Sequence, residues 1–175
     1  MSDTTKAVIE AALRRARELG IKRIVVASCS GRTAEALIGC GLDVVCVTHQ
    51  VGFYRPGEDE MSQEMRGKLA EQGVKLLTTT HLMAGIDRSL RLLFGGVYPS
   101  EIVATTLRML GDGTKVCCEI STMAVDAGLA TPGEDLIAIG GTGTGADTAC
   151  VISPSHSQEF FKTRVREIVT KPFDV

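Results

Sequence analysis

The chain has 175 residues, of which 44% are hydrophobic, and its 19 lysines and arginines nearly balance 21 aspartates and glutamates. This length suits a single domain, residues 1–175, and the balanced charge argues against nucleic acid as a partner, because no basic run exceeds two residues. No apolar stretch approaches the roughly 20 residues needed to cross a bilayer and the N-terminus lacks the features of a signal peptide, so we expect no membrane partner and a cytoplasmic protein.

The beginning of the chain alternates between helix and strand. Thr4 or Thr5 can cap a first helix that ends at Gly20 and carries four apolar residues on one face, Val8, Ala12, Ala16 and Leu19. Strands are predicted at residues 24–27 and 43–48, with a helix from about Arg32 to Ile38 between them. The second strand, DVVCVT, is too uniformly apolar for a sheet edge, which is typical of a parallel sheet covered by helices on both faces.

The first candidate site is the loop between the first strand and the second helix. Residues 24–36 read IVVASCSGRTAEA, the pattern of a strand, a tight loop and a helix N-terminus. Free amide groups and the helix dipole attract anions at such a position, and hydroxyl and guanidinium groups add donors. A simpler interpretation is that Ser30 only caps the helix and Gly31 only allows the turn. We expect a phosphate group to bind Ser28, Cys29, Ser30, Gly31, Arg32 and Thr33.

The six cysteines show neither a CxxC pair nor regular spacing, and most lie among apolar neighbours. We therefore expect them to be reduced residues of the core. Cys29 is the possible exception, since a helix N-terminus would lower the pKa of its thiol and make it reactive. A purely structural role is the favoured interpretation for Cys29 as well.

Polar and aromatic residues follow the next two strands. The second strand is followed directly by His49, and the loop after it carries Phe53 and Tyr54. A helix containing Met61, Met65 and Leu69 leads to a third strand at 75–79, which ends near His81. Ligands of α/β proteins bind at the carboxyl ends of strands, so we expect His49, Phe53 and His81 to line a ligand site. A metal site formed by His49, His81 and His156 is a weaker alternative, because no pair has helical ligand spacing.

The middle of the chain is mainly helical. Residues 82–98 predict a partly helical segment that could cover a site or contact another copy of the chain. Ser100 can cap a helix through Leu110, and a further helix is predicted at 114–127. Lys115 and Glu119 lie four residues apart on it, which most simply indicates a solvated ion pair. Glu119 also lies beside apolar positions and could instead be an inward functional carboxylate.

The second candidate site is a glycine-rich loop between predicted strands at 136–139 and 148–152. This connection is too short for a parallel crossover, so the last strand must be antiparallel to its predecessor. The glycine spacing does not fit a dinucleotide fingerprint, and the loop lacks the Walker lysine. Its backbone could be approached closely by a ligand, although a flexible hairpin is the alternative. The candidate residues are Gly141, Thr142, Gly143, Thr144, Gly145 and Asp147. A final helix is predicted at 157–169.

Taken together, these stretches resemble the C-terminal α/β domain of pyruvate kinase. The phrases that carry the resemblance are VVASCSGRTA, VTHQVGF, GGVYPSEIVATTLRML, KVCCEISTMAVDAGL and IAIGGTGTGADTA. They are similar to small free-standing proteins of the pyruvate kinase alpha/beta domain-like family over nearly the whole chain. The resemblance implies a three-layer α/β/α sandwich with a mixed five-strand sheet of order 3-2-1-4-5, strand 5 being antiparallel. It places the two candidate loops on either side of one crevice.

The resemblance also implies flavin mononucleotide (FMN) as a ligand. Its phosphate would bind residues 28–33, and residues 141–145 would approach the ring or ribityl chain. We expect either an FMN-binding protein, which could act as an oxidoreductase, or a non-catalytic sensor of a phosphorylated metabolite. Catalysis is not implied, and pyruvate kinase activity is not expected without the catalytic barrel of that enzyme. A homo-oligomer is possible.

Overall fold

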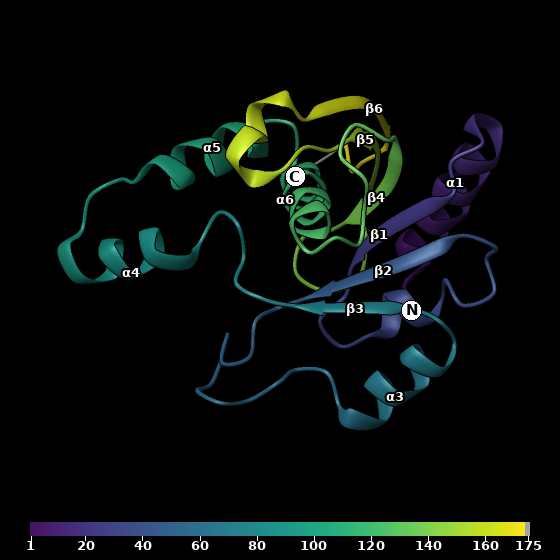
Figure 1. Ribbon diagram of the computed structural model, residues 1–175, viewed down its shortest axis with the longest axis horizontal. Coiled ribbons are helices and arrows are strands. Elements are labelled where there is room, and N and C mark those ends of the chain that lie inside the picture. Colours follow the sequence, from purple (N-terminus) through teal and green to yellow (C-terminus); the bar gives the residue numbers. More distant parts are fainter. Residues whose placement is uncertain (174–175) are drawn as a thin grey trace.

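The computed structural model describes residues 1–173, which form a six-stranded mixed sheet with helices on both faces (Figure 1). The strand order is β3-β2-β1-β4-β5-β6. β1 is parallel to both β2 and β4, β2 is parallel to β3, and β5 is antiparallel to β4. The predicted α/β class, the order 3-2-1-4-5 and the antiparallel fifth strand are therefore confirmed. The strands are β1 (Arg23–Ala27), β2 (Asp43–Thr48), β3 (Lys75–Thr78), β4 (Leu136–Gly140), β5 (Thr148–Ser153) and β6 (Arg164–Thr170).

The sixth strand corrects the prediction of a final helix at 157–169. The segment begins with a short 3-10 helix, η1 (Ser157–Lys162), and continues as β6, antiparallel to β5. β6 has the sequence RVREIVT, in which Val165 and Ile168 pack against the core. Its β-branched residues suit a strand. Pairing with β6 also satisfies the backbone N–H and C=O groups at the edge of β5, which a helix would leave without partners.

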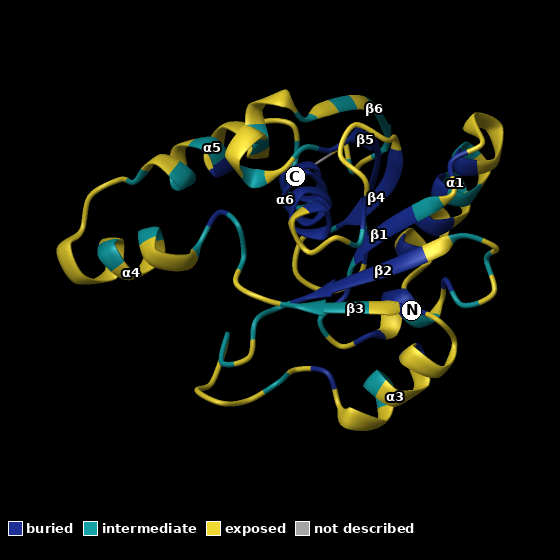
Figure 2. Ribbon diagram, viewed as in Figure 1, coloured by how far each residue is buried: buried dark blue, intermediate teal, exposed yellow. Residues whose placement is uncertain are grey.

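Successive residues of β1 and β4 face opposite layers, which gives the fold two hydrophobic cores. Ile24 and Val26 pack with the first layer of helices, whereas Val25 packs with the second. The first layer contains α1 (Asp3–Leu19), α2 (Arg32–Glu35) and α3 (Gln63–Glu71), and the second contains α6 (Asp112–Asp126). Figure 2 shows α6 and the central strands as the most buried part of the molecule. The three-layer sandwich is thus confirmed.

Several helix boundaries differ from the prediction. Ser2, and not Thr4 or Thr5, caps α1, because its side chain accepts a hydrogen bond from the Thr5 amide. α2 is a single turn that ends at Glu35 instead of Ile38. α5 (Pro99–Arg108) is preceded by Tyr98 at its N-cap, not by Ser100. These boundaries depend on local hydrogen bonds and backbone geometry that several neighbouring residues could have supplied.

A helical arm projects from the sandwich (Figure 1, teal). It consists of α4 (Gly85–Phe94) and α5, and it confirms the prediction of partly helical structure in residues 82–98. None of the residues of α4 is buried. Its apolar side chains Ile86, Leu92, Leu93 and Phe94 are all about three-quarters exposed. No helix within residues 1–173 is long and apolar enough to cross a membrane.

Candidate functional site

A crevice of about 580 Å³ opens where the carboxyl ends of β1 and β2 meet the loop between β4 and β5. The strand order explains its position, because β2 lies on one side of β1 and β4 on the other, so the direction of winding reverses between β1 and β4. Residues from both predicted loops and from the loop after β2 line it. The predicted site residues in its wall are Ser28, Cys29, Ser30, Arg32, Thr33, His49, Phe53, Gly141, Gly143, Thr144 and Gly145.

The first loop is held by Ser28 and not by Ser30. The Oγ atom of Ser28 accepts hydrogen bonds from the amides of Thr33 (3.1 Å) and Ala34 (3.4 Å). Ser30 instead accepts one from Arg32 Nε, at 3.3 Å. Within residues 1–173, the amides of Cys29, Ser30 and Arg32, three residues that line the crevice, donate to no protein acceptor, so they remain available to a ligand.

Gly31 shapes this loop without lining the crevice. Its φ is +83°, in the left-handed region that glycine favours. A Cβ atom there would lie 2.4 Å from Cγ of Met65, so packing against α3 also requires glycine. Gly31 thus positions the donors on either side of it.

The glycine-rich loop is fixed by Asp147, which does not line the crevice. Asp147 Oδ2 accepts a hydrogen bond from the amide of Thr142 (2.9 Å), and its Oδ1 accepts one from the Thr148 hydroxyl (2.6 Å). Thr142 likewise contributes to the loop and not to the wall of the crevice. Through these two hydrogen bonds, Asp147 orders the glycine-rich loop.

The N-terminus of α1 closes the crevice, which the sequence did not suggest. Met1, Ser2 and Thr5 line it, and the buried Thr5 hydroxyl is hydrogen-bonded to both the amide (3.0 Å) and the carbonyl (3.1 Å) of Ala146. This contact joins segments 141 residues apart in the chain. No sequence pattern links the two segments, so only the folded structure identifies these residues as part of the crevice.

Four aromatic rings form a cluster at the other side of the crevice. The rings of His49 and Phe53 stack with centroids 3.9 Å apart, and His81 lies edge-on to His49 at 5.1 Å. Tyr54 completes the cluster, and the guanidinium of Arg88 lies 5.4 Å from the Phe53 centroid. The structure thus brings together the three predicted aromatic and histidine residues, although His81 lines a neighbouring cavity and not the crevice.

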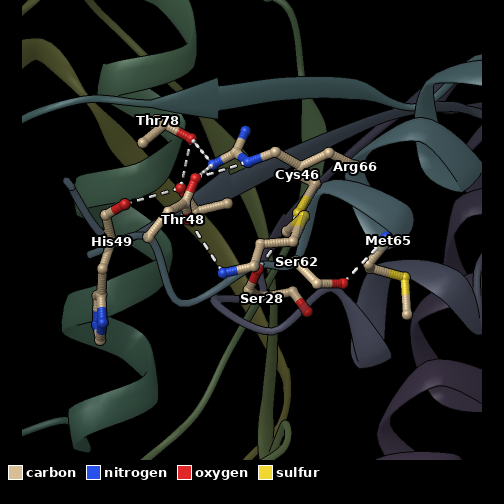
Figure 3. Close-up of polar contacts among 10 residues, drawn as sticks. Ser28, Cys46, Thr48, His49, Ser62, Met65, Arg66 and Thr78 are labelled. Carbon is tan, nitrogen blue, oxygen red and sulfur yellow. Dashed lines mark hydrogen bonds and ion pairs between the residues drawn. The ribbon is translucent and has the colours of Figure 1, made fainter. Parts of the chain in front are cut away.

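The backbone at His49 is supported from beneath by a polar network (Figure 3). Thr48 donates through Oγ1 to the His49 carbonyl, at 2.8 Å, and is hydrogen-bonded to the hydroxyl of Thr78 at 2.7 Å. Arg66 donates to Thr78 at 2.7 Å and forms an ion pair with Asp59. The network ties the ends of β2 and β3 to α3, while the ring of His49 points away from it.

The structure contradicts the interpretation of Cys29 as a reactive thiol. Burial raises the pKa of Cys29 to about 11, and the nearby Glu60 raises it further, against the opposing effect of a hydrogen bond with the His49 backbone. All six cysteines are free and four are buried, as expected for reduced core residues.

The three histidines do not form the alternative metal site. His156 lies at η1 and contacts Asp126, whereas His49 and His81 lie in the aromatic cluster. A different set of donors, Cys29, His49 and Glu60, has ligand atoms within 4.8 Å of one another at the wall of the crevice. These donor types suit Zn²⁺, but His49 Nδ1 and Glu60 Oε1 are already hydrogen-bonded at 2.5 Å.

Lys115 and Glu119 form the predicted ion pair, but the pair is buried and not solvated. Lys115 is 8% exposed and Glu119 is 4% exposed. The sheet and α5 cover α6 on two sides. Lys115 and Glu119 therefore lie in the interior together with the neighbouring apolar residues of α6. The pair lines a second cavity together with His81. Burial lowers the pKa of His81, although the charge of Glu119 opposes this effect.

Comparison with protein families agrees with the fold. A family model described as pyruvate kinase, alpha/beta domain, matches residues 6–152. Among solved structures, the chain is similar to Cryptosporidium parvum pyruvate kinase in complex with ADP, with 16% sequence identity and a TM-score of 0.43. That match covers 98% of this chain but 24% of the pyruvate kinase chain. Because the family model spans most of the sequence, the chain belongs to the pyruvate kinase alpha/beta domain family.

Proposed function

We propose that the crevice binds a phosphorylated small molecule and that FMN is this ligand. The observation that carries the proposal is the composition of the crevice wall. Hydroxyl groups, Arg32 and free amides line one part, bare glycine backbone lines another, and stacked aromatic rings line a third. These surfaces suit a phosphate, a polyol chain and a flat ring respectively. The volume lies within the range of about 300–1,000 Å³ found for small-molecule sites.

The residues present fit FMN in charge as well as in shape. The side chain of Arg32 and the amides of Cys29, Ser30 and Arg32 would hold its phosphate, and His49 and Phe53 would contact its ring. Bound FMN would supply a redox-active ring that exchanges one or two electrons. The chain itself would bind and orient the ring and would limit the access of water to one side of it.

A sensor of another phosphorylated metabolite is the second candidate. It is favoured by the concentration of donors in the first loop, which would recognise any phosphate ester. It is also favoured by Glu60 in the wall near the aromatic cluster, because a carboxylate there suits sugar hydroxyl groups. In this case the aromatic cluster would pack against a sugar and not against a flavin.

An absorbance spectrum from about 300 to 550 nm, taken before and after addition of FMN and gel filtration, separates the two candidates. A retained flavin spectrum supports FMN binding, whereas a flat spectrum in both samples contradicts it and directs the search to phosphorylated metabolites.

Two substitutions test the crevice itself. Arg32→Ala removes a phosphate donor, and Gly143→Val forces a β-branched residue into a backbone with φ of +77°. Both variants should fold, because Arg32 is exposed and a Cβ at Gly143 would meet no atom within 4 Å. Arg32→Ala should bind FMN at least about tenfold more weakly, since a charge-assisted hydrogen bond contributes about 1.5–3 kcal/mol. Gly143→Val should also weaken binding, because the strained backbone and the added side chain change the surface that the ligand approaches. Unchanged affinity in both would exclude this crevice.

A further inference from the structure

A second cavity, of about 240 Å³, lies between α4, α5 and α6, and among residues 1–173 it shares no lining residue with the crevice. Four cations and two carboxylates line it, namely Arg88, Arg91, Arg108, Lys115, Glu101 and Glu119. We propose that this cavity binds a small anionic metabolite through its carboxylate or phosphate group. The site is distinct from the one in the proposed function.

Arg88 is the cation most available to such a ligand. Arg91 forms an ion pair with Glu101, and Arg108 forms one with Asp112 at 2.7 Å. Within residues 1–173, Arg88 pairs with no carboxylate, and its guanidinium lies over the ring of Phe53. A guanidinium in this state can bind a carboxylate or phosphate with two parallel hydrogen bonds.

The buried pair of Lys115 and Glu119 forms the floor of the cavity. Glu119 uses both oxygens, one for Lys115 Nζ and one for the amide of Met83 at 2.7 Å. The ammonium of Lys115 has three N–H donors, and among the described residues only Glu119 accepts from it. Two buried donors therefore remain for a ligand.

Stability alone does not account for this arrangement. A buried ion pair contributes little net stability, because removing both charges from water offsets most of their attraction. Apolar residues of similar size would fill the space between α5 and α6 without that cost. A bound oxyanion that accepts hydrogen bonds from Lys115 would explain why a lysine is buried at the wall of a polar cavity.

The dimensions of the cavity restrict the ligand to a few carbon atoms. A volume of 240 Å³ corresponds to the share of about eight water molecules in the liquid. It is smaller than the roughly 300 Å³ at the lower end of sites for drug-sized molecules. Short dicarboxylates and small phosphate esters fit this space, and both carry the oxyanion that Arg88 and Lys115 would recognise.

Amide chemical-shift titrations of the full chain with malonate and, separately, with inorganic phosphate would test the proposal. We expect saturable shifts at Met83, Ala104, Thr105, Lys115 and Glu119 with one or both probes. Shifts with malonate alone assign a carboxylate ligand, and shifts with phosphate alone assign a phosphate ester. Shifts confined to residues 28–33 and 141–145, or no saturable shift, would overturn the proposal.

Two matched arginine variants distinguish the sites. Arg88→Gln should weaken binding at the second cavity about tenfold, the effect of losing a charge-assisted hydrogen bond. Arg88 is exposed, so the variant should fold, and its amide chemical shifts away from residue 88 should match those of the wild type. Arg32→Gln, in the crevice, should leave binding at the second cavity unchanged. Equal affinity of the wild type and Arg88→Gln would contradict the proposal even if the crevice binds its ligand as expected.

Discussion

At the scale of single residues, two glycines of the same loop differ in what surrounds them. Gly143 and Gly145 both have positive φ, +77° and +86°. A Cβ at Gly143 would meet open space, whereas one at Gly145 would lie 2.6 Å from the Thr5 hydroxyl oxygen. The two positions therefore separate backbone strain from steric overlap.

Gly145→Ala should destabilise the protein more than Gly143→Ala. Each alanine adds about 1–2 kcal/mol of left-handed backbone strain, and overpacking adds about 1–3 kcal/mol at Gly145 alone. Urea unfolding of the two variants measures the difference. Equal free energies of unfolding would show that Thr5 moves aside without cost.

Cys29 should react slowly with thiol reagents near neutral pH. Because its pKa is raised to about 11, almost all of the thiol is protonated there, and the thiolate is the nucleophile. The alkylation rate of a variant that retains only Cys29 should keep increasing with pH toward 11. A rate that already levels off below pH 8 would contradict this prediction.

His81 should make stability depend on pH. Its pKa is lowered in the folded protein, so between that value and the ordinary value of about 6.5 the unfolded chain binds more protons. The free energy of unfolding should therefore rise with pH through this interval and become independent of His81 above it. His81→Gln should remove this part of the slope, whereas His156→Gln should leave it in place.

At the scale of elements, α1 and the glycine-rich loop depend on one hydroxyl group. Thr5 bonds both backbone groups of Ala146, and Ala146 is buried. Thr5→Val keeps the shape of the side chain but leaves these polar groups without partners. The loop that lines the crevice is therefore coupled to the helix packed beneath the sheet.

Thr5→Val should lower the free energy of unfolding by about 1–3 kcal/mol, the cost of buried polar groups that lose their hydrogen bonds. Thr4→Val, at the exposed neighbouring position, is the matched control and should change it by less than about 0.5 kcal/mol. Thermal or urea unfolding would measure both. If the two variants are equally stable, the loop does not depend on Thr5.

At the scale of the whole molecule, the sandwich and the arm differ in burial. α6 is buried along most of its length, whereas α4 has no buried residue. Figure 2 shows this contrast between the interior and the projecting arm. Amides in α4 depend on local hydrogen bonds alone, and those in α6 require opening of the core.

Hydrogen exchange should therefore be fast in residues 86–94 and slowest in residues 116–125. The measurement is made on the chain at low concentration, with its mass checked by light scattering. Protection of α4 equal to that of α6 in a monomer would contradict the prediction. Protection that rises with protein concentration would show that another copy covers the arm.

The chain itself determined the parts of the fold that depend on local pattern. The apolar run at 43–48 predicted a strand buried on both faces, and the short glycine-rich connection required an antiparallel pair. Both follow from backbone geometry within a few residues of the chain. The resemblance carried by the two loops supplied the strand order and the expectation that they share a crevice.

Only the tertiary structure decided features that depend on contacts distant in sequence. β6 was mistaken for helix because its short apolar pattern suits either state until β5 offers an edge. The sequence could not show that Thr5 holds the loop at Ala146, or that the ion pair of Lys115 and Glu119 is buried in a cavity wall. Spacing along one helix indicates which residues are neighbours, but burial depends on which elements pack against that helix, and the packing is set by the whole chain.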